Sequence, residues 1–325
     1  MIVPAYGVAH LVGEALASLK AQTLANWECV VIDDGAPDDV ASAVAPFLSD
    51  PRIRFLATAN HGVSAARNTA IAATSAPLIA LLDGDDRFRP DYLATMVPLL
   101  EGHPDVRLAT CNTLLFGALP REQLCFTHRQ GSSDGVHGSL LDVLDRSFSV
   151  YIGTTFRRAD FNSIAGFNES MTHSEDLDLW VRLLQLGGYA RYVDQVLGDY
   201  RIRAGSASAN ATRMLLGNIK VFEKVRAALA PNRSEQAALT AAINASRQAI
   251  AFEHAIDKVI DGDTRKGLAE LRAITGQVEG PVWSAAFTMW RLLPALARPM
   301  LRWRRNAHSR GAQGSIAAKL AEIQL

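Results

Sequence analysis

The stretch Leu81-Leu82-Asp83-Gly84-Asp85-Asp86 decides the fold, because it joins an apolar run to a cluster of acids. Residues 77–82 are continuously apolar, which is typical of a strand buried on both faces of a parallel sheet. Three carboxylates follow within a few residues, and each charge raises the cost of ionising the next. A divalent cation removes that cost, and Mg²⁺ prefers a few carboxylates together with substrate phosphates. The Asp-x-Asp spacing predicts a metal–diphosphate site; the alternative is a polar turn that caps the next helix.

A second apolar run, residues 27–32, ends in the same manner at Asp33-Asp34-Gly35. In an open α/β sheet, ligands bind outside the carboxyl ends of the strands, where the strand order reverses. Two strands that each end in acids therefore predict one pocket with two acidic walls. One pair would hold a metal, and the other would accept hydrogen bonds from a base or a ribose.

The bulk composition limits the class of protein. The chain has 325 residues, of which 49% are hydrophobic, and it can form one large domain with or without an appendage. Equal numbers of basic and acidic residues predict no general attraction to nucleic acid. Three cysteines without pairing or metal spacing favour a reducing, cytoplasmic compartment. Neither a signal peptide nor a membrane-spanning run is expected.

Strand-like and helix-like patterns alternate through the first half of the chain, which predicts βαβ units and a mainly parallel sheet flanked by helices. Segment 117–138 has a loop-like composition, and a shift toward Ala, Leu, Arg and Glu near residue 212 predicts a C-terminal helical appendage. We therefore expect a catalytic domain over 1–210 and an appendage over 211–325. The expected strands are 2–3, 27–32, 53–57, 77–82 and 106–116, with an extended segment at 150–161; the expected helices are 8–21, 38–48, 63–74, a helix from Pro90, and 174–187.

Segment 60–68 reads as a Gly-containing entry into a helix, where free backbone N–H groups can receive an anion. Arg67 lies about one turn inside that helix. Its guanidinium would pair with a phosphate or with one of the acids, and the alternative is an ordinary surface arginine. A second basic segment, Tyr200-Arg201-Ile202-Arg203, precedes a Gly/Ser turn. It would either close over a diphosphate or simply connect to the helical tail.

A further acidic pair, Glu175-Asp176, opens the expected helix at 174–187. Thr172 and Glu175 have capping-box spacing, which gives Glu175 a structural explanation. Asp176 is less well explained in this way, because Asp178 adds a third acid for little further gain. A carboxylate at this helix N-terminus would act as a general base toward a hydroxyl nucleophile.

Residues 1–210 contain a set of motifs in a fixed order. In chain order these motifs are Val3-Pro4-Ala5-Tyr6, Ser18-Leu19-x-x-Gln22-Thr23, Trp27-Glu28-x-Val30-Val31-Ile32-Asp33-Asp34-Gly35, Asn60-x-Gly62-x-Ser64-x-Ala66-Arg67-Asn68, Leu82-Asp83-x-Asp85-Asp86, Gly166-Phe167-Asn168-Glu169, Glu175-Asp176-x-Asp178-Leu179-Trp180 and Tyr200-Arg201. Together these residues resemble a family 2 glycosyltransferase of the GT-A fold, and the ordered set is far more specific than any one motif.

The resemblance implies an inverting, nucleotide-diphosphate-sugar-dependent enzyme that uses Mn²⁺ or Mg²⁺. Arg203 stands where many members of the family carry a histidine, and it would neutralise diphosphate charge instead of ligating the metal. The implied roles are nucleobase contacts for Pro4, Tyr6 and Asp34, support of the nucleotide by Arg67, metal binding by Asp83 and Asp85 with Asp85 as the direct ligand, and deprotonation of the acceptor hydroxyl by Asp176.

The tail over 280–321 contains no acidic residue but many arginines and tryptophans. A basic, Trp-rich amphipathic segment is typical of a bilayer interface, where anionic lipids attract it. Pro294 and Pro299 are expected to break any long helix there. The alternative is a helical appendage packed on the catalytic domain, with its arginines solvated.

The resemblance implies a metal-dependent glycosyltransferase that acts on a saccharide or lipid-linked acceptor in bacterial surface polysaccharide synthesis. It would lie in the cytoplasm, with peripheral contact to an anionic membrane. A nucleotidyltransferase is disfavoured, because the chain lacks a Gly-rich, Lys-bearing phosphate loop near its start. The remaining alternative is a degenerate nucleotide-sugar-binding or scaffolding protein without transfer activity.

Overall fold

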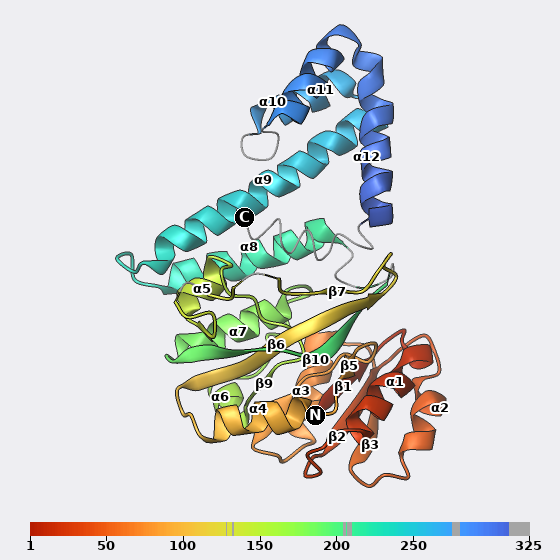
Figure 1. Cartoon of the computed structure of the whole chain (residues 1–325), viewed down its shortest axis with the longest axis vertical. Helices are drawn as coiled ribbons and strands as arrows, with labels where there is room; N and C mark the ends of the chain where they lie inside the picture. Colours follow the sequence, from red (N-terminus) through yellow and green to blue (C-terminus); the bar gives the residue numbers. More distant parts are fainter. Residues whose placement is uncertain (128, 132, 204–205, 207–209, 275–279, 312–325) are drawn as a thin grey trace. The chain divides into compact units, whose positions relative to one another are not determined.

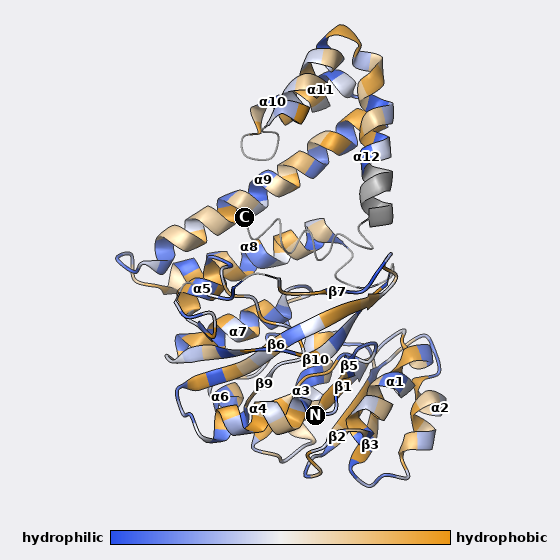
Figure 2. Cartoon of the chain, viewed as in Figure 1, coloured by the Kyte–Doolittle hydropathy of each residue, from blue (hydrophilic) through white to orange (hydrophobic). Residues whose placement is uncertain are grey.

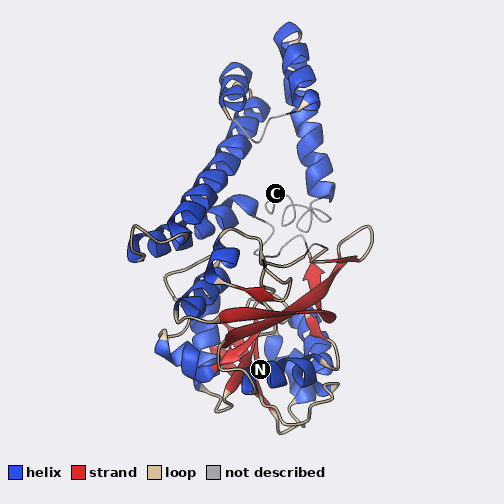
Figure 3. Ribbon diagram, turned by 60° about the vertical axis from the view of Figure 1, so that its left-hand side comes forward, coloured by secondary structure: helices blue, strands red, loops and turns tan. Residues whose placement is uncertain are grey.

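The computed structural model describes residues 1–127, 129–131, 133–203, 206, 210–274 and 280–311, with side chains through residue 304. The chain divides into a unit over Met1–Ile202 and a second unit that begins at Arg203. In Figure 3 the strands lie in the first unit, with helices around them, and the described elements of the second unit are helices.

The first unit opens with a parallel sheet in the order β1-β2-β3. The apolar run predicted as a strand forms the middle of this sheet, and its residues Cys29 to Ile32 are fully buried. Helices α1 and α2 lie on one face, and α3 packs against β1 and β2 (Figure 1). The elements are β1 (Ile2–Ala5), α1 (Ala9–Lys20), β2 (Cys29–Asp34), α2 (Val40–Val44) with a 3-10 turn (Ala45–Phe47), β3 (Ile53–Thr58) and α3 (Val63–Ala72).

The second sheet is mixed, with the order β4-β9-β6-β10-β5. Long strands β6 and β10 run parallel, whereas β4, β5, β7, β8 and β9 pair antiparallel to their neighbours. The strands are β4 (Leu78–Ala80), β5 (Arg87–Phe88), β6 (Val106–Gly117), β7 (Gln123–Leu124), β8 (His137–Gly138), β9 (Thr155–Arg157) and β10 (Tyr189–Ile202).

The α/β prediction is therefore confirmed, but the expected mainly parallel order applies to the first sheet only. Parallel neighbours need a long crossover connection, usually a helix. The connection from β6 to β7 spans only 118–122, so β7 can pair with β6 only as an antiparallel strand. The loop-like segment 117–138 accordingly contributes two short strands to the rim of this sheet.

One contact between the two sheets positions the acidic stretch. Leu81 forms a parallel bridge with Ile2, and the Leu82 N–H donates to the Ile2 carbonyl at 3.0 Å. Strand β4 thus lies beside β1, and the spatial order becomes β3-β2-β1-β4. The chain order reverses between β1 and β4, which is where α/β sheets bind ligands.

Four helices complete the first unit: α4 (Tyr92–Glu101), α5 (Leu140–Leu144), α6 (Arg158–Ser163) and α7 (Glu175–Gln185). The helix expected from Pro90 begins at Tyr92, because Pro90 and Asp91 form the turn before it. The extended segment expected over 150–161 is a strand only at β9, since α6 follows directly.

The expected capping box at the start of α7 is absent from the described structure. Ser174 is the N-cap residue, with a left-handed backbone (φ 58°) and no side-chain capping bond. Glu175 instead pairs with an arginine from α3, at an N–O distance of 2.9 Å. The tertiary ion pair thus takes the carboxylate that local spacing assigned to the cap.

The second unit consists of α8 (Ala211–Ala228), α9 (Glu235–Asp261), α10 (Thr264–Ala273), α11 (Pro281–Leu292), a 3-10 turn (Pro294–Leu296) and α12 (Ala297–Gly311). Helix α9 packs against α8, α10 and α12. Pro294 separates α11 from α12 as expected, while Pro299 lies in the first turn of α12, where its missing N–H is tolerated. No helix among the described residues is sufficiently long and apolar to cross a membrane.

Asn68 joins α3 to the Gly166-Phe167-Asn168-Glu169 motif. Its Nδ2 donates to the Phe167 carbonyl at 3.0 Å and to Glu169 Oε1 at 2.9 Å, and its Oδ1 accepts the Phe167 N–H at 2.9 Å. A Cβ on Gly166 would lie 2.8 Å from Asn68 Oδ1, so a glycine is required for this approach. Two motifs that are far apart in sequence thus form one contact.

We expect Asn68→Ala to destabilise the first unit by about 1–3 kcal/mol, because it leaves the Phe167 backbone polar groups without their partner. Urea unfolding followed by far-UV circular dichroism measures this change. Asn162→Ala, at an exposed site on α6, is the matched control and should change stability by less than about 0.5 kcal/mol. Equal unfolding midpoints for the two variants would contradict the assigned role of Asn68.

Candidate active site

Five of the predicted site residues lie at the carboxyl ends of three neighbouring parallel strands. Pro4 and Tyr6 are at the end of β1, Asp34 is the last residue of β2, and Asp83 and Asp85 follow β4. Tyr6 is 54% exposed, which leaves its ring accessible to a planar ligand. The structure therefore brings these residues to the edge of the sheet that the sequence indicated.

Gly84 allows the acidic loop to lie directly on β1. A Cβ at this position would be 2.9 Å from the Pro4 carbonyl oxygen and 3.1 Å from Val8 Cγ2. Any larger residue would push the loop away from the strand. The glycine between Asp83 and Asp85 thus keeps both carboxylates next to the Pro4–Tyr6 segment.

Asp86, the third acid of the loop, points inward and has a structural role. It is 1% exposed; its Oδ1 accepts the Arg201 N–H at 2.8 Å, and its Oδ2 accepts the Tyr151 hydroxyl at 3.2 Å. Burial, together with the charges of Asp85 and Asp83, raises the pKa of Asp86 well above its ordinary value. The Arg201 Nε also donates to the Asp85 carbonyl at 2.8 Å. Asp86 and Arg201 therefore fix the acidic loop on its buried side, a role that the sequence did not reveal.

Asp34 shapes the turn before α3. Its Oδ1 accepts the His61 N–H and its Oδ2 accepts the Gly62 N–H, both at 2.9 Å. On the neighbouring loop, Asp38 accepts the N–H groups of Gly7 and Ala9 at 3.0 and 2.6 Å, which holds the backbone next to Tyr6. Both aspartates thus organise the backbone at the edge of the site. The role of Asp34 in nucleobase binding stays a prediction.

Arg67 is the centre of the cluster. Its side chain is 3% exposed; one terminal nitrogen donates to Asp83 Oδ1 at 2.7 Å and the other to Glu175 Oε1 at 2.9 Å. Its guanidinium carbon also lies 5.4 Å from the centre of the Phe167 ring. The sequence suggested that Arg67 pairs either with a phosphate or with an acid, and in the structure its partners are the acids Asp83 and Glu175. A direct contact of Arg67 with a nucleotide stays a prediction.

The Arg67 bridge brings the N-terminus of α7 to the acidic loop. Asp176, next to Glu175, has a pKa raised to about 6, mainly by burial and then by the Glu175 charge, while Arg67 opposes the shift. The pKa of Arg67 is itself raised by the charges of Asp83, Glu175 and Asp176, against the effect of its burial. A carboxylate with a pKa near 6 is suited to accept a proton near neutral pH.

A divalent cation fits the donor set, although the protein offers few ligands. Among the described residues, no group of three or more His, Cys, Asp or Glu side chains is arranged to hold a metal. Asp83 keeps 30% of its side chain exposed beside the Arg67 contact, and Asp85 is partly exposed on the same loop. Mg²⁺ and similar hard ions are commonly held by one or two carboxylates plus substrate phosphates. The loop thus suits a metal that arrives with a diphosphate.

Arg203 is the first residue of the second unit. Its contact with the donor diphosphate therefore stays a prediction. The parts of the 117–138 loop at residues 128 and 132 lie outside the described residues.

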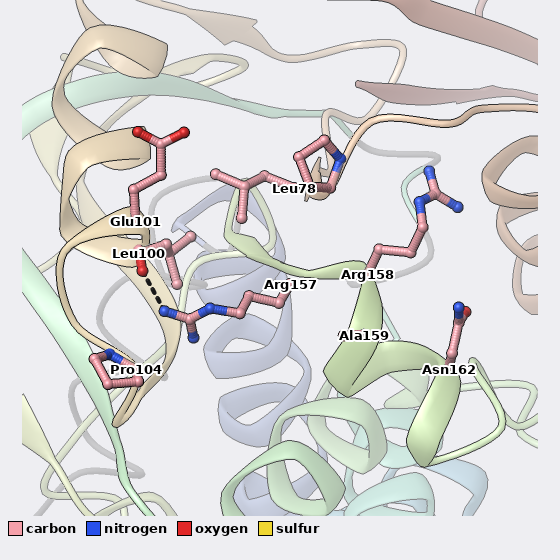
Figure 4. Close-up of a pocket in the computed structure, with 9 residues that line it drawn as sticks. Leu78, Leu100, Glu101, Pro104, Arg157, Arg158, Ala159 and Asn162 are labelled. Atoms are coloured by element: carbon pink, nitrogen blue, oxygen red, sulfur yellow. Dashed lines mark hydrogen bonds between the residues drawn. The ribbon is translucent and has the colours of Figure 1, made fainter.

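A separate pocket of about 650 Å³ lies near the start of β4, and it is lined by residues that include Pro77, Leu78, Arg157 and Arg158 (Figure 4). Arg157 donates to the Val106, Leu100 and His103 carbonyls. Arg158 donates to the Ala76 and Ile71 carbonyls. Because Leu78 begins β4 whereas Asp83 follows its end, this pocket is at the opposite end of the strand from the acidic cluster.

Comparison with known sequences identifies the family. The sequence profile of Glycosyl transferase family 2 matches residues 1–113, and that of Glycosyl transferase family group 2 matches residues 78–252. The succinoglycan biosynthesis protein ExoU of Rhizobium meliloti is 30% identical over 258 residues, which cover 72% of this chain and 70% of ExoU. The chain belongs to glycosyltransferase family 2.

A second relative of the family 2 chain is the Escherichia coli protein WfgD, a UDP-Glc:alpha-D-GlcNAc-diphosphoundecaprenol beta-1,3-glucosyltransferase. It is 27% identical over 225 residues, which cover 66% of this chain and 81% of WfgD. Other curated relatives are much longer, and the chain spans about a third of their length or less. The family thus includes relatives in polysaccharide and lipid-linked sugar synthesis.

Solved structures confirm the GT-A fold. The mannosyltransferase PcManGT from Pyrobaculum calidifontis, solved in complex with GDP-Man and Mn²⁺, superposes with a TM-score of 0.63 at 18% sequence identity. The match covers 98% of this chain and 86% of that protein. The predicted family and fold class are therefore both confirmed.

We expect Arg67→Gln to lower stability more at pH 8 than at pH 5. The Arg67 charge holds the pKa of Asp176 down, so removing the guanidinium raises that pKa further in the folded state. The folded protein then binds more protons than the unfolded chain in this range, so stability falls as pH rises. Thermal melting at both pH values measures the difference, and Arg54→Gln, which breaks an exposed pair with Glu28, is the control. Equal losses at pH 5 and pH 8 would contradict the bridging role of Arg67.

Proposed function

We propose that this family 2 protein is an inverting glycosyltransferase, with catalysis in residues 1–210 and helical residues 211–325 as an appendage. It would move a sugar from a nucleotide-diphosphate donor to a hydroxyl of a saccharide or lipid-linked acceptor in bacterial surface polysaccharide synthesis. The observation that carries the proposal is the buried Arg67 guanidinium, which contacts both Asp83 and Glu175. It joins the loop suited to the donor diphosphate to the helix end that carries the candidate base.

The donor would bind across the carboxyl ends of β1, β2 and β4. Pro4 and the exposed ring of Tyr6 would contact the nucleobase, with Asp34 at the neighbouring strand end. Arg67 would support the nucleotide indirectly, by fixing Asp83. Arg203 would neutralise diphosphate charge.

Asp85 and Asp83 would hold Mn²⁺ or Mg²⁺ together with the diphosphate. The bound ion supplies charge neutralisation for the diphosphate leaving group. Asp83 is kept in place by Arg67, and the backbone next to Asp85 is kept in place by Arg201. The chain's own contribution is thus a rigid loop, anchored on both sides, that presents two carboxylates.

Asp176 would accept the proton of the acceptor hydroxyl. As that O–H bond breaks, the acceptor oxygen forms a bond to the anomeric carbon, and the bond from this carbon to the diphosphate oxygen breaks. The nucleoside diphosphate leaves with the electron pair, and one in-line displacement inverts the anomeric configuration. The pKa of about 6 supports this role, because Asp176 is then mainly ionised at neutral pH.

The relatives support a nucleotide sugar as donor without fixing the base. WfgD takes its glucose from UDP-Glc, whereas PcManGT was solved with GDP-Man. The WfgD acceptor is a sugar on diphosphoundecaprenol, which supports a lipid-linked acceptor here. Such an acceptor would place the reaction at the inner face of the cytoplasmic membrane.

We expect the nucleoside diphosphate of one base, and its sugar conjugates, to raise the melting temperature only when Mn²⁺ is present. A ligand that binds the native state stabilises that state by mass action. Asp85→Ala should abolish the metal-dependent part of this shift. Asp105→Ala, which removes an exposed aspartate before β6, should leave it unchanged. The absence of any shift from UDP- and GDP-linked ligands would favour a scaffolding protein instead.

We expect Asp176→Asn to leave donor affinity unchanged and to lower kcat by about 10²–10⁴-fold, because only proton abstraction is lost. In the parent protein, kcat/KM should rise about tenfold per pH unit below pH 6 and level off above it, following ionisation of one carboxyl group. Initial-rate measurements across pH, with donor titrations of the variant, check both results. Full transfer activity in Asp176→Asn would exclude this residue as the base.

A further inference from the structure

The junction of α11 and α12 exposes apolar side chains that the second unit does not bury. Leu292 and Leu293 are 74% and 57% exposed, and Trp303 is 73% exposed. The i, i+4, i+7 spacing of Leu296, Met300 and Trp303 places these exposed residues on one side of the turn and of α12. We call Leu292, Leu293, Leu296, Met300 and Trp303 the junction face. The turn within it is coloured mainly as hydrophobic in Figure 2.

The junction face is separate from the core of the second unit. Trp290, Ala297 and Leu301 are buried in a cluster with residues of α9 and α10, and Trp283 packs against the same cluster. The aromatic residues of the tail are thus divided between this core and the surface. Of the tryptophans in the tail, Trp303 is the exposed one. The residues of the junction face are not members of this cluster.

Positive charge borders the junction face. Residues 280–311 contain six arginines and no acidic residue, in a chain whose net charge is zero. Arg291 is exposed next to Leu292. Arg298 is also exposed, but it lies on another side of α12 from Leu296 and Met300, and its Nε donates to the Ile260 carbonyl at 2.7 Å. Leucines and a tryptophan in an arginine-rich segment match the two layers of an anionic bilayer interface, namely acyl chains and charged headgroups.

The same charge pattern disfavours a second copy of this chain as the occupant. In a symmetric dimer, the same patch faces itself, so the arginines of both copies would be brought together. Like charges across an interface oppose association. An anionic surface, in contrast, is complementary to both features of the junction face.

We propose that the junction face docks this protein on the interface of an anionic lipid bilayer. Leu292, Leu293 and Trp303 enter the boundary between headgroups and acyl chains, while Arg291 pairs with lipid phosphates. This docking needs neither the donor site nor transfer activity. It can therefore be tested, and can fail, independently of the proposed glycosyltransferase function.

Flotation of the full chain with lipid vesicles tests the proposal. We expect binding to vesicles that contain phosphatidylglycerol, weaker binding to pure phosphatidylcholine, and a loss of affinity as salt is added. Leu292→Ser and Trp303→Ala should each weaken binding by about tenfold, and Arg291→Gln by about fivefold. Leu48→Ser is the control, because Leu48 is also an exposed leucine (43%) but lies in the first unit, outside the junction face.

Fluorescence gives a second measurement, because it reports whether a tryptophan enters the bilayer. Trp27, Trp180 and Trp290 are buried, and Trp283 is partly buried against the core of the second unit. A blue shift on vesicle addition that is lost when Trp303 is replaced is therefore assigned to Trp303. Trp303→Phe should keep vesicle binding and lose the blue shift. The proposal is overturned if the protein does not bind anionic vesicles, if it binds neutral vesicles equally well, or if Leu292→Ser binds like Leu48→Ser. A dimer in light scattering that Leu292→Ser dissociates would assign the face to a second copy.

Discussion

The buried guanidinium of Arg67 is the contact on which the rest of the site depends. Asp83, Glu175 and Asp176 come from two segments of the chain, and their like charges would repel one another if nothing stood between them. Arg67 is bonded to Asp83 and Glu175 at 2.7 and 2.9 Å and is almost fully buried. Because removal of one partner from a buried ion pair is costly, the loop after β4 and the start of α7 are held in one relative position.

The surrounding packing supports this bridge from several sides. Gly84 lets the acidic loop approach β1, and Asp86 holds the same loop through Arg201 and Tyr151. Asn68, one residue after Arg67, fastens α3 to the backbone at Phe167. The contacts that fix the geometry are thus mostly bonds between a side chain and the backbone of a distant segment. Such bonds keep the carboxylates in place without competing for the oxygens that a ligand would use.

Much of the fold and part of the site could be predicted from local patterns. The apolar runs before Asp33 and Asp83 indicated buried strands, and the structure places these two strands on either side of β1 with their acids at the same edge. The sequence pattern did not reveal which of the acids are buried in the protein interior. Asp86 and Asp83 have similar sequence surroundings, yet Asp86 is buried against Arg201 whereas Asp83 faces Arg67. Similarly, Thr172 and Glu175 suggested a helix cap, but Glu175 pairs with Arg67 because that partner offers a charge and a capping N–H does not.

By itself, the sequence determined the order of the elements, the family and the identity of the acids that end β2 and β4. These follow from periodicity and from motifs, which are properties of neighbouring residues along the chain. Only the tertiary structure decided the mixed order of the second sheet, the partners of Arg67 and the exposure of Trp303 while Trp290 is buried. The physical reason is that burial and pairing depend on residues brought together from distant segments. No local spacing specifies which of several similar side chains will meet them.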